Sequence, residues 1–315
     1  MKVSVVVITY NQERYLAQAL ESALAQRVNF EYEIVVGEDC STDGTRAVLM
    51  DFYRRYPDRI VPLLRERNIG GSKNSMATRA TCRGEYIAML AGDDYWIADD
   101  KLQKQADFLD AHPDWVICCS RGRILDEAGT HEYPSVHPSI PAGEYTVNDL
   151  LQGNFILTCT VMYRRESVGE VPDWLPKRTL GDWPLYAIIA TKGKIHLMDE
   201  ATATYRVHAG AVWSTQPLHH RLGECVRMLA DLDGHLKFRY TDTIRRTIAR
   251  HHWEMATLAQ QQGERMETMK HVAGYLRNGG LRVPGSKLPL AALVAYAVFG
   301  SWSKALGKVR RAILR

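Results

Sequence analysis

Three short apolar runs in the first hundred residues each lead into polar residues that can bind ligands. The clusters and the runs that precede them are Thr9-Tyr10-Asn11 after Val3–Ile8, Glu38-Asp39 with Asp43 after Ile34–Val36, and Asp93-Asp94 after Tyr86–Leu90. Grouped carboxylates repel one another unless hydrogen-bond donors or a cation share their site. A divalent cation holding a diphosphate is the simplest explanation of such acidic clusters.

The apolar runs alternate with stretches of helical periodicity, and this alternation predicts an α/β fold with a mostly parallel sheet. Leu16, Leu20 and Leu24 recur every four residues and mark the inner face of a first helix. Ligands of parallel sheets collect at the carboxyl ends of the strands, where all three polar clusters are expected.

Later segments extend the same pattern. We expect helices from Thr45, over 71–83, over 99–111 and from Asp182, and strands over 59–64, 86–90, 115–120, 156–163, 195–198 and 203–207. Pro62 predicts an edge position for the strand over 59–64. Residues 121–153 contain three prolines and are expected to form an irregular, mobile loop on the acceptor side. Residues 216–283 are expected to be helical.

Composition excludes several classes of protein. Hydrophobic residues make up 46% and charged residues 24% of the 315 residues, which is ordinary for a globular chain. The net charge of +4 comes without a basic stripe interleaved with aromatic residues in the first two-thirds, so no nucleic-acid partner is expected. The six cysteines show no C-x-x-C pair and are expected to be reduced thiols in the cytoplasm. No signal peptide is expected, because Met1-Lys2 leads directly into the first strand.

The ordered motifs resemble the family 2 glycosyltransferases of bacterial polysaccharide and glycoconjugate synthesis, which have the nucleotide-sugar-binding GT-A fold. The resemblance covers about residues 1–215 and rests on Thr9-Tyr10-Asn11, Glu38-Asp39, Asp43-Gly44-Thr45, Asn68-Ile69-Gly70, Gly84-Glu85-Tyr86-Ile87, Asp93-Asp94, Gly181-Asp182-Trp183 and Tyr205-Arg206-Val207-His208. It implies an enzyme that moves a sugar from a nucleotide-diphosphate sugar, a UDP-sugar before a dTDP-sugar, to a saccharide or lipid-linked acceptor.

The resemblance also implies a nucleotide site. It places Thr9, Tyr10 and Asn11 at the base and Asp39 at a ring N–H of a pyrimidine. A carboxylate can accept a hydrogen bond from this N–H. Asp43 and Asn68 are expected in the same site. An alternative for Asp39 and Asp43 is a solvated turn that caps the following helix.

Asp93 and Asp94 are implied to bind a divalent cation, Mn²⁺ or Mg²⁺, with Asp93 also reaching toward the ribose. Many family members carry a further carboxylate two positions before Asp93, where this chain has Ala91. His208 is implied as a further contact to the metal or the phosphates, although a lone histidine is more often structural.

Asp182 matches the family position of the base that deprotonates the acceptor hydroxyl, and a single displacement of this kind inverts the anomeric carbon. It can also cap the helix that it begins. Trp96 and Trp183 are expected at the donor and acceptor pocket. The sequence does not identify the donor sugar or the acceptor.

Rival functions differ in their motifs. A dinucleotide oxidoreductase needs G-x-G-x-x-G after the first strand, where Tyr10-Asn11-Gln12-Glu13 has no glycine. A nucleotidyltransferase needs a glycine-rich basic loop there, which is also missing. A non-catalytic nucleotide-sugar-binding or scaffold protein differs from the enzyme by Asp182 alone and remains the alternative.

Residues 284–315 predict a basic amphipathic helix. Trp302, Leu306, Val309 and Ile313 form one stripe, and Lys304, Lys308, Arg311 and Arg315 form the opposite one. Basic side chains next to anionic lipid contribute about 1 kcal/mol each. We therefore expect residues 286–315 to lie on the inner face of the cytoplasmic membrane; packing on the catalytic domain or a second subunit is the alternative.

Overall fold

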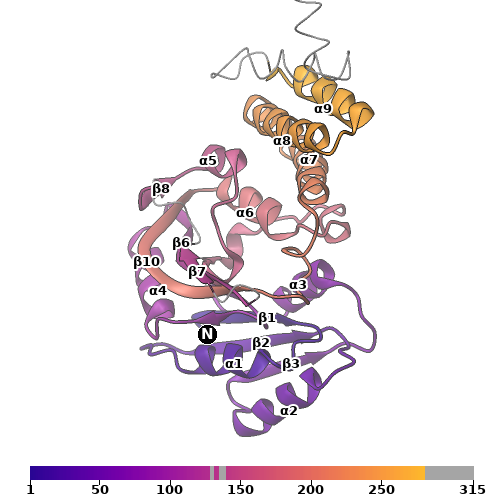
Figure 1. Cartoon of the computed structure of the whole chain (residues 1–315). Helices are drawn as coiled ribbons and strands as arrows, with labels where there is room; N and C mark the ends of the chain where they lie inside the picture. The colour runs from indigo at the N-terminus through magenta and orange to yellow at the C-terminus, as the bar shows by residue number, and fades with distance from the viewer. Residues whose placement is uncertain (128–130, 135–139, 281–315) are drawn as a thin grey trace, which may run out of the picture. The chain divides into compact units, whose positions relative to one another are not determined.

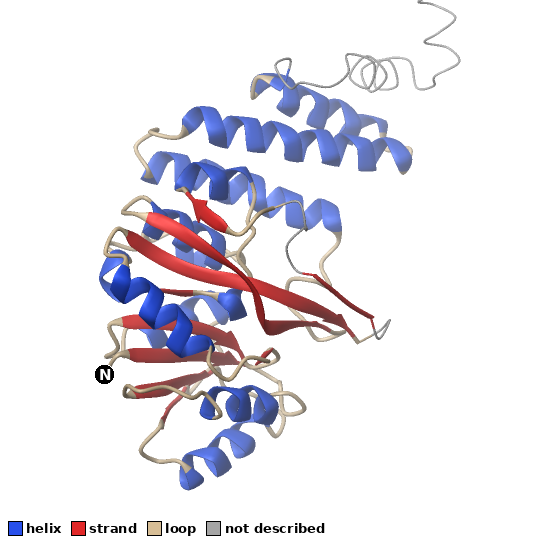
Figure 2. Cartoon of the chain, turned by 90° about the vertical axis from the view of Figure 1, so that its left-hand side faces the viewer, coloured by secondary structure: helices blue, strands red, loops and turns tan. Residues whose placement is uncertain are grey.

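The computed structural model describes residues 1–127, 131–134 and 140–280 (Figure 1). The chain divides into two compact units, Met1–Thr215 and the residues from Gln216 onward. The first unit contains a large mixed sheet with helices around it, and the described part of the second contains α-helices (Figure 2). The expected basic helix over 284–315 lies outside the described residues.

The elements of the first unit alternate along the chain as the sequence predicts. In order they are β1 (Val3–Thr9), α1 (Leu16–Leu24), β2 (Tyr32–Glu38), α2 (Thr45–Arg55), β3 (Ile60–Leu64), α3 (Gly71–Arg79), β4 (Tyr86–Ala91), β5 (Tyr95–Trp96), α4 (Lys101–Ala111), β6 (Trp115–Asp126), β7 (His131–Pro134), β8 (Gly143–Tyr145), α5 (Val147–Gln152), β9 (Met162–Arg164), α6 (Asp182–Ala190) and β10 (Lys194–Val207). The second unit has α7 (Leu218–His235), α8 (Thr241–Gln261) and α9 (Arg265–Arg277).

Among the described residues, the sheet runs in the order β3-β2-β1-β4-β9-β6-β10-β5, with β7 on β6 and β8 on β10. Strands β1 to β4 are parallel, and β9 joins β4 to β6 through antiparallel pairs on both sides. The predicted edge position of the strand that contains Pro62 is confirmed, because β3 ends the sheet.

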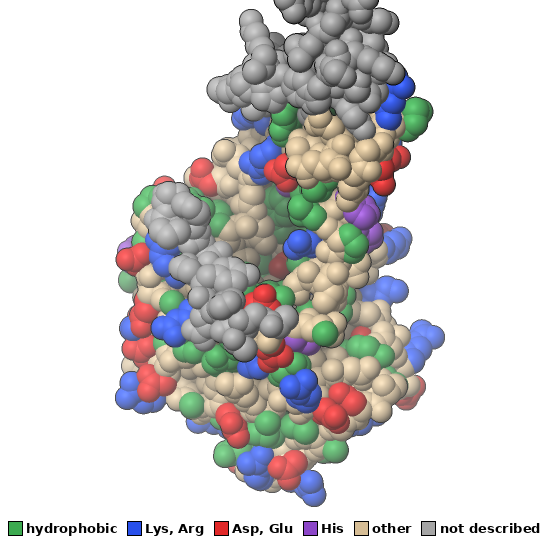
Figure 3. All heavy atoms as spheres, viewed as in Figure 1, with side chains coloured by type: hydrophobic (Ala, Val, Ile, Leu, Met, Phe, Trp, Pro, Cys, Tyr) green, Lys and Arg blue, Asp and Glu red, His purple; other side chains and the backbone are tan. Residues whose placement is uncertain are grey.

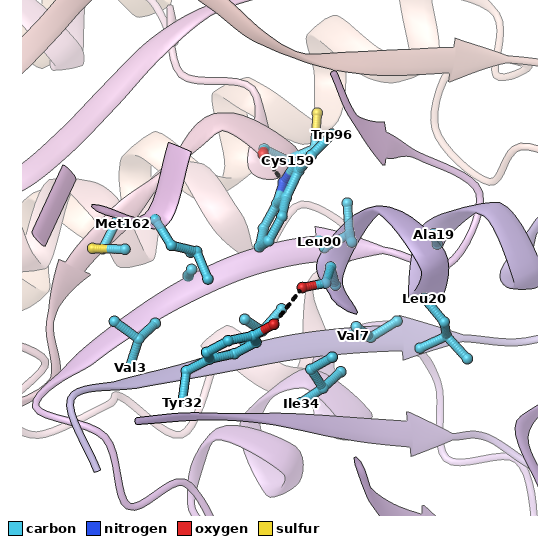
Figure 4. Packing of buried hydrophobic residues seen from close by; sticks show 14 of the residues in the cluster. Val3, Val7, Ala19, Leu20, Tyr32, Ile34, Leu90, Trp96, Cys159 and Met162 are labelled. Atoms are coloured by element: carbon cyan, nitrogen blue, oxygen red, sulfur yellow. Dashed lines mark hydrogen bonds between the residues drawn. The ribbon is translucent and has the colours of Figure 1, made fainter. Parts of the chain in front are cut away.

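The core explains why the carboxyl ends of the strands stay fixed. Alternate residues of β1 and β2 point into one cluster with the buried faces of α1, α2 and α4. Figure 4 shows Val7, Ile34 and Leu90 on neighbouring strands of this cluster, with Leu20 of α1 also in it. The three strand residues are fully buried. The loops that follow these strands therefore begin from rigid positions.

Three expected segments differ from the structure. Residues 121–153 are not one irregular loop: β6 continues to Asp126, and β8 and α5 follow. The polar residues of 121–126 are in a strand because β6 pairs with the parallel β10 over this length. The expected strand over 156–163 is a short 3-10 turn followed by β9, and the two strands over 195–207 are one strand, β10, with register shifts.

Candidate active site

The loops after β1 and β2 are interlocked by hydrogen bonds. The backbone N–H of Asp39 donates to the carbonyl of Thr9 at 3.1 Å. The Asn11 side-chain oxygen accepts from the N–H of Thr42 at 2.8 Å, and the Asn11 N–H donates to the Ser41 hydroxyl at 3.0 Å. Asn11 has a φ of 52°, a conformation that asparagine tolerates better than most residues. Thr9 is buried, whereas 41% of Tyr10 is exposed beside these loops.

Asp39 is 1% exposed and holds a third loop in place. Its two carboxylate oxygens accept from the N–H groups of Ile69 and Gly70, each at 2.9 Å. The Asn68 side chain accepts from the same Gly70 N–H at 3.1 Å. The structure thus brings the predicted residues Asp39 and Asn68 together. Each carboxylate oxygen has a second lone pair, so Asp39 can still accept from a ligand.

Asp43 caps the first N–H of α2 from the position before Gly44, which is the N-cap residue of the helix. Its Oδ1 accepts from the backbone N–H of Thr45 at 3.0 Å, where α2 begins, and its Oδ2 accepts from the Glu13 N–H at 3.2 Å. Burial acts to raise the pKa of Asp43, but the hydrogen bonds from Thr45 and Glu13 outweigh it and lower the pKa. Asp43 therefore supports the nucleotide loops through α2.

Asp93 and Asp94 have different surroundings although they are adjacent. Asp94 is 1% exposed, its Oδ1 accepts from the backbone N–H of Arg206 at 2.9 Å, and the Cys159 thiol lies beside it. Burial, and next the charge of Asp93, raises the pKa of Asp94 well above its usual value. Asp93 Oδ2 instead lies 3.0 Å from His208 Nε2. Asp93 and His208 thus present a carboxylate and an imidazole to each other from the ends of two strands.

Behind His208 lies a group of residues that the sequence did not single out. The His208 ring packs on Tyr15, with ring centroids 4.6 Å apart. The Tyr15 hydroxyl donates to Glu127 at 2.8 Å, and Glu127 also pairs with Arg206 at 3.3 Å. Arg206 was visible in the sequence only as part of the motif that ends in His208. Glu127 gave no signal, because it is separated from Tyr15 by 112 residues.

Asp182 is the first residue of α6, and both of its carboxylate oxygens are used. Oδ2 accepts from the Thr158 hydroxyl at 2.8 Å, and Oδ1 accepts from the Trp183 N–H at 2.7 Å. Burial, followed by Asp94, Asp93 and Asp182, raises the pKa of Tyr205 on β10. All three carboxyl groups therefore lie near enough to Tyr205 to affect its ionisation.

Trp96 and Trp183 lie behind the site. Trp96 is 5% and Trp183 is 4% exposed, and their indole N–H groups donate to the carbonyls of Cys159 and Leu150 at 2.8 and 2.9 Å. Figure 4 shows Trp96 within the hydrophobic core beside Cys159. In this conformation the two rings contribute packing and hold neighbouring segments.

Asp93 and His208 offer two groups to a cation, and no cluster of three or more such ligands occurs in the described part of the chain. Two protein groups suit Mg²⁺ or Mn²⁺ in this fold, because these ions keep several waters and take their remaining ligands from substrate phosphates.

On the face in Figure 3, basic and acidic side chains are interspersed. No helix among the described residues is long and apolar enough to span a bilayer.

Comparison with known proteins identifies the family. Residues 4–171 match the model of glycosyl transferase family 2. Rv1520, an uncharacterized protein of Mycobacterium tuberculosis, is 38% identical over 214 residues, which are 67% of this chain and 60% of that protein. The putative teichuronic acid biosynthesis glycosyltransferase TuaG of Bacillus subtilis is 30% identical over 218 residues, 68% of this chain and 82% of TuaG.

Solved structures share the fold. Staphylococcus aureus TarS in complex with UDP-GlcNAc superposes with a TM-score of 0.66 at 20% identity, over 99% of this chain and 92% of that one. The mannosyltransferase PcManGT of Pyrobaculum calidifontis, in complex with GDP-Man and Mn²⁺, gives 0.59 at 17% identity, over 99% and 84%. With the matching family model over more than half of its length, the chain belongs to glycosyltransferase family 2, and its first unit has the GT-A fold.

Proposed function

We propose that this protein is a metal-dependent, inverting glycosyltransferase. It moves a sugar from a UDP-sugar, with dTDP-sugars as the alternative donors, to a hydroxyl of a saccharide or lipid-linked acceptor in surface polysaccharide or glycoconjugate synthesis. The observation that carries this proposal is the Asp93–His208 pair at the carboxyl ends of β4 and β10, with Asp182 near enough to affect the ionisation of Tyr205 on β10. The similarity to TuaG and to TarS, a poly(ribitol-phosphate) N-acetylglucosaminyltransferase, supports the acceptor class.

The nucleotide lies on the loops after β1 and β2 in this proposal. Tyr10 covers the base, Thr9 and Asn11 border it, and Asp39 accepts from the imide N–H of the pyrimidine through a remaining lone pair. Asp39 also fixes Asn68 and the residues after it, so base binding and loop order are coupled through one carboxylate. The complex of TarS with UDP-GlcNAc supports a nucleotide-sugar donor.

Asp93 and His208 are the residues that would hold the divalent cation, which neutralises the diphosphate as it leaves. Asp94 acts by positioning rather than as a direct ligand. Its carboxyl group is buried against the Arg206 N–H, two residues before His208, and so it fixes the end of β10 relative to β4. The complex of PcManGT with GDP-Man and Mn²⁺ supports the use of a cation.

Asp182 is the general base. It takes the proton of the acceptor hydroxyl while that oxygen bonds to the anomeric carbon, and the bond from this carbon to the diphosphate oxygen breaks. The hydrogen bonds from Thr158 and Trp183 aim the carboxylate and leave it lone pairs for the proton. Attack from the face opposite the leaving group inverts the anomeric carbon.

Isothermal titration of UDP with and without Mn²⁺ tests the donor site. We expect Mn²⁺ to tighten binding in the wild type and not in Asp93→Asn; equal affinity with and without Mn²⁺ would contradict the metal role. A screen of donor sugars for hydrolysis or transfer, with Asp182→Asn as the control, separates an enzyme from a non-catalytic binder. Product NMR that shows the donor's anomeric configuration would overturn inversion.

The membrane role of residues 286–315 stays a prediction, because these residues lie outside the described structure. Flotation with anionic liposomes tests it by comparing the full chain with a chain that ends at Gly285. Equal flotation would show that the segment does not hold the protein at the inner face of the membrane.

A further inference from the structure

A cleft lies at the opposite end of the strands β2 and β3 from the nucleotide loops, which are the loops after β1 and β2. It has a volume of about 410 Å³, within the range of small-ligand sites. Tyr32 begins β2, and Arg59 directly precedes β3, so the cleft is at the amino ends of these strands. The nucleotide loops follow the carboxyl ends of the strands. The two ends of the seven-residue strand β2 are about 20 Å apart.

The floor and rim of the cleft combine rings with guanidinium groups. Tyr32 and Phe52 are each 3% exposed and form the floor, while Tyr56 is 41% exposed at the rim. The Arg55 guanidinium lies 4.1 Å from the centre of the Phe52 ring, and that of Arg59 lies 4.6 Å from the centre of the Tyr32 ring. Stacked guanidinium groups keep their N–H edges free to bind an oxyanion in two-point contacts.

The charges of the cleft are suited to a ligand of mixed character. Arg55 forms an ion pair with Asp51 at 3.0 Å, whereas the Arg59 guanidinium has no carboxylate partner among the described residues. Glu21 lines the opposite wall, next to the C-terminal end of α1. The C-terminal ends of α1 and α2 both border the cleft and carry partial negative charge, which favours hydroxyl donors; the guanidinium groups of Arg55 and Arg59 offset this charge on their side.

We propose that this cleft is a second, non-catalytic binding site for a saccharide that carries a carboxylate or phosphate group. Arg59 and Arg55 bind the oxyanion, Glu21 accepts from ring hydroxyls, and the exposed Tyr56 ring packs on the C–H face of the sugar. The inference rests on the proposed function, because a glycosyltransferase has a reason to bind saccharides outside its active site. An anionic acceptor chain held in this cleft stays near the active site between transfers.

Titration calorimetry with the full chain tests the site with four probes: a galacturonate trisaccharide, the matched neutral galactose trisaccharide, glucose 6-phosphate and inorganic phosphate. We expect binding of the acidic trisaccharide, of glucose 6-phosphate or of both, and the pair shows whether the anion is a uronate or a phosphate. Binding of inorganic phosphate as tight as that of both anionic sugars, or equal binding of the neutral trisaccharide, would overturn the proposal.

Variants locate the binding. Arg59→Gln is expected to weaken it at least about tenfold, the loss typical of a hydrogen bond to a charged group. Tyr56→Ala is expected to weaken it because the sugar loses the aromatic ring on which it packs. Arg54→Gln is the matched control, because Arg54 lies on the same helix with 72% of its side chain exposed and does not line the cleft. Unchanged binding in Arg59→Gln, or an equal loss in Arg54→Gln, would contradict the assignment.

The two sites can fail independently. UDP binding by Arg59→Gln is expected to equal that of the wild type, and Asp182→Asn is expected to keep its affinity for the acidic saccharide. If Asp182→Asn retains full transferase activity while Arg59→Gln loses saccharide binding, the proposed catalytic base is wrong and the second site stands. If UDP and Arg59-dependent saccharide compete for one site, the inference of a second site is wrong.

Discussion

Carboxylates at the two ends of the parallel strands β1 to β4 differ in their partners, apart from Glu38, which ends β2 and pairs with Arg46 at 2.5 Å. At the amino ends, acidic side chains pair with cations: Glu33 with Arg83 at 2.6 Å, and Asp110 with Lys2 at 2.7 Å. At the carboxyl ends, Asp39 and Asp94 are bound by backbone N–H groups, and Asp93 by a histidine. Backbone donors orient a carboxylate without cancelling its charge. Among the described residues, Asp39 and Asp94 are thus held without a cationic side chain, and burial raises the pKa of Asp94 well above its usual value.

The largest effect is expected for Asp182→Asn. The amide keeps the size of the side chain and an acceptor for Thr158, but it cannot take a proton from the acceptor. We expect the turnover rate to fall about 10²–10⁴-fold with UDP affinity unchanged. Asp199→Asn is the control, because Asp199 is 79% exposed and its ion pair among the described residues is with Arg121. A loss below tenfold would remove Asp182 from the chemistry.

The next largest effect should separate the two adjacent acids. Asp93→Asn and His208→Gln are each expected to weaken Mn²⁺-dependent UDP binding at least about tenfold, because each removes one of the two groups that would hold the cation. Asp94→Asn keeps an acceptor for the Arg206 N–H and should retain most of that dependence. Calorimetry at a series of Mn²⁺ concentrations measures all three. The reverse order of losses would make Asp94 the direct ligand.

How much of this comparison the sequence could predict depends on how local each contact is. The carboxyl-end clusters follow apolar strands directly, so the parallel sheet and the meeting of Asp39 with Asn68 follow from strand order. The partner of Asp182 is Thr158, in a turn that the sequence suggested to be a strand. The support of His208 by Tyr15 and Glu127 joins segments more than 100 residues apart, and no periodicity or spacing encodes such a contact.

Glu33→Gln tests the amino-end half of the comparison. Glu33 is 2% exposed and accepts from the Ser4 hydroxyl and from the backbone and side chain of Arg83. We expect the free energy of unfolding to fall by about 1–2 kcal/mol, because charged hydrogen bonds are lost and a buried amide faces a guanidinium. UDP affinity and turnover should not change. A loss of activity in a folded Glu33→Gln protein would contradict the division between the two ends.

Glu33 also makes the stability of the fold depend on pH, and the sign of this dependence follows from its pKa. Burial acts to raise the pKa of Glu33, but its hydrogen bonds to Arg83 and Ser4 outweigh burial and lower the pKa below its usual value of 4.5. The native state then binds the proton less tightly than the unfolded chain. This contribution to stability is complete above about pH 4.5 and is lost as the pH falls through the lowered value. Urea unfolding between pH 7 and pH 3 should show a shallower acid loss in Glu33→Gln than in the wild type.

The smallest effect is expected for Asp43, which lies at the carboxyl end of the sheet but is bound like a structural residue. Its side chain accepts from Thr45 at the start of α2 and from the Glu13 N–H. Asp43→Ala should lower the free energy of unfolding by about 1 kcal/mol, the usual cost of removing such a cap. Asp43→Asn should lose less, because asparagine also accepts from helix N–H groups. If UDP affinity follows stability across the two variants, Asp43 acts through α2. If both variants abolish UDP binding while they stay folded, Asp43 contacts the nucleotide itself and belongs to the site with Asp39.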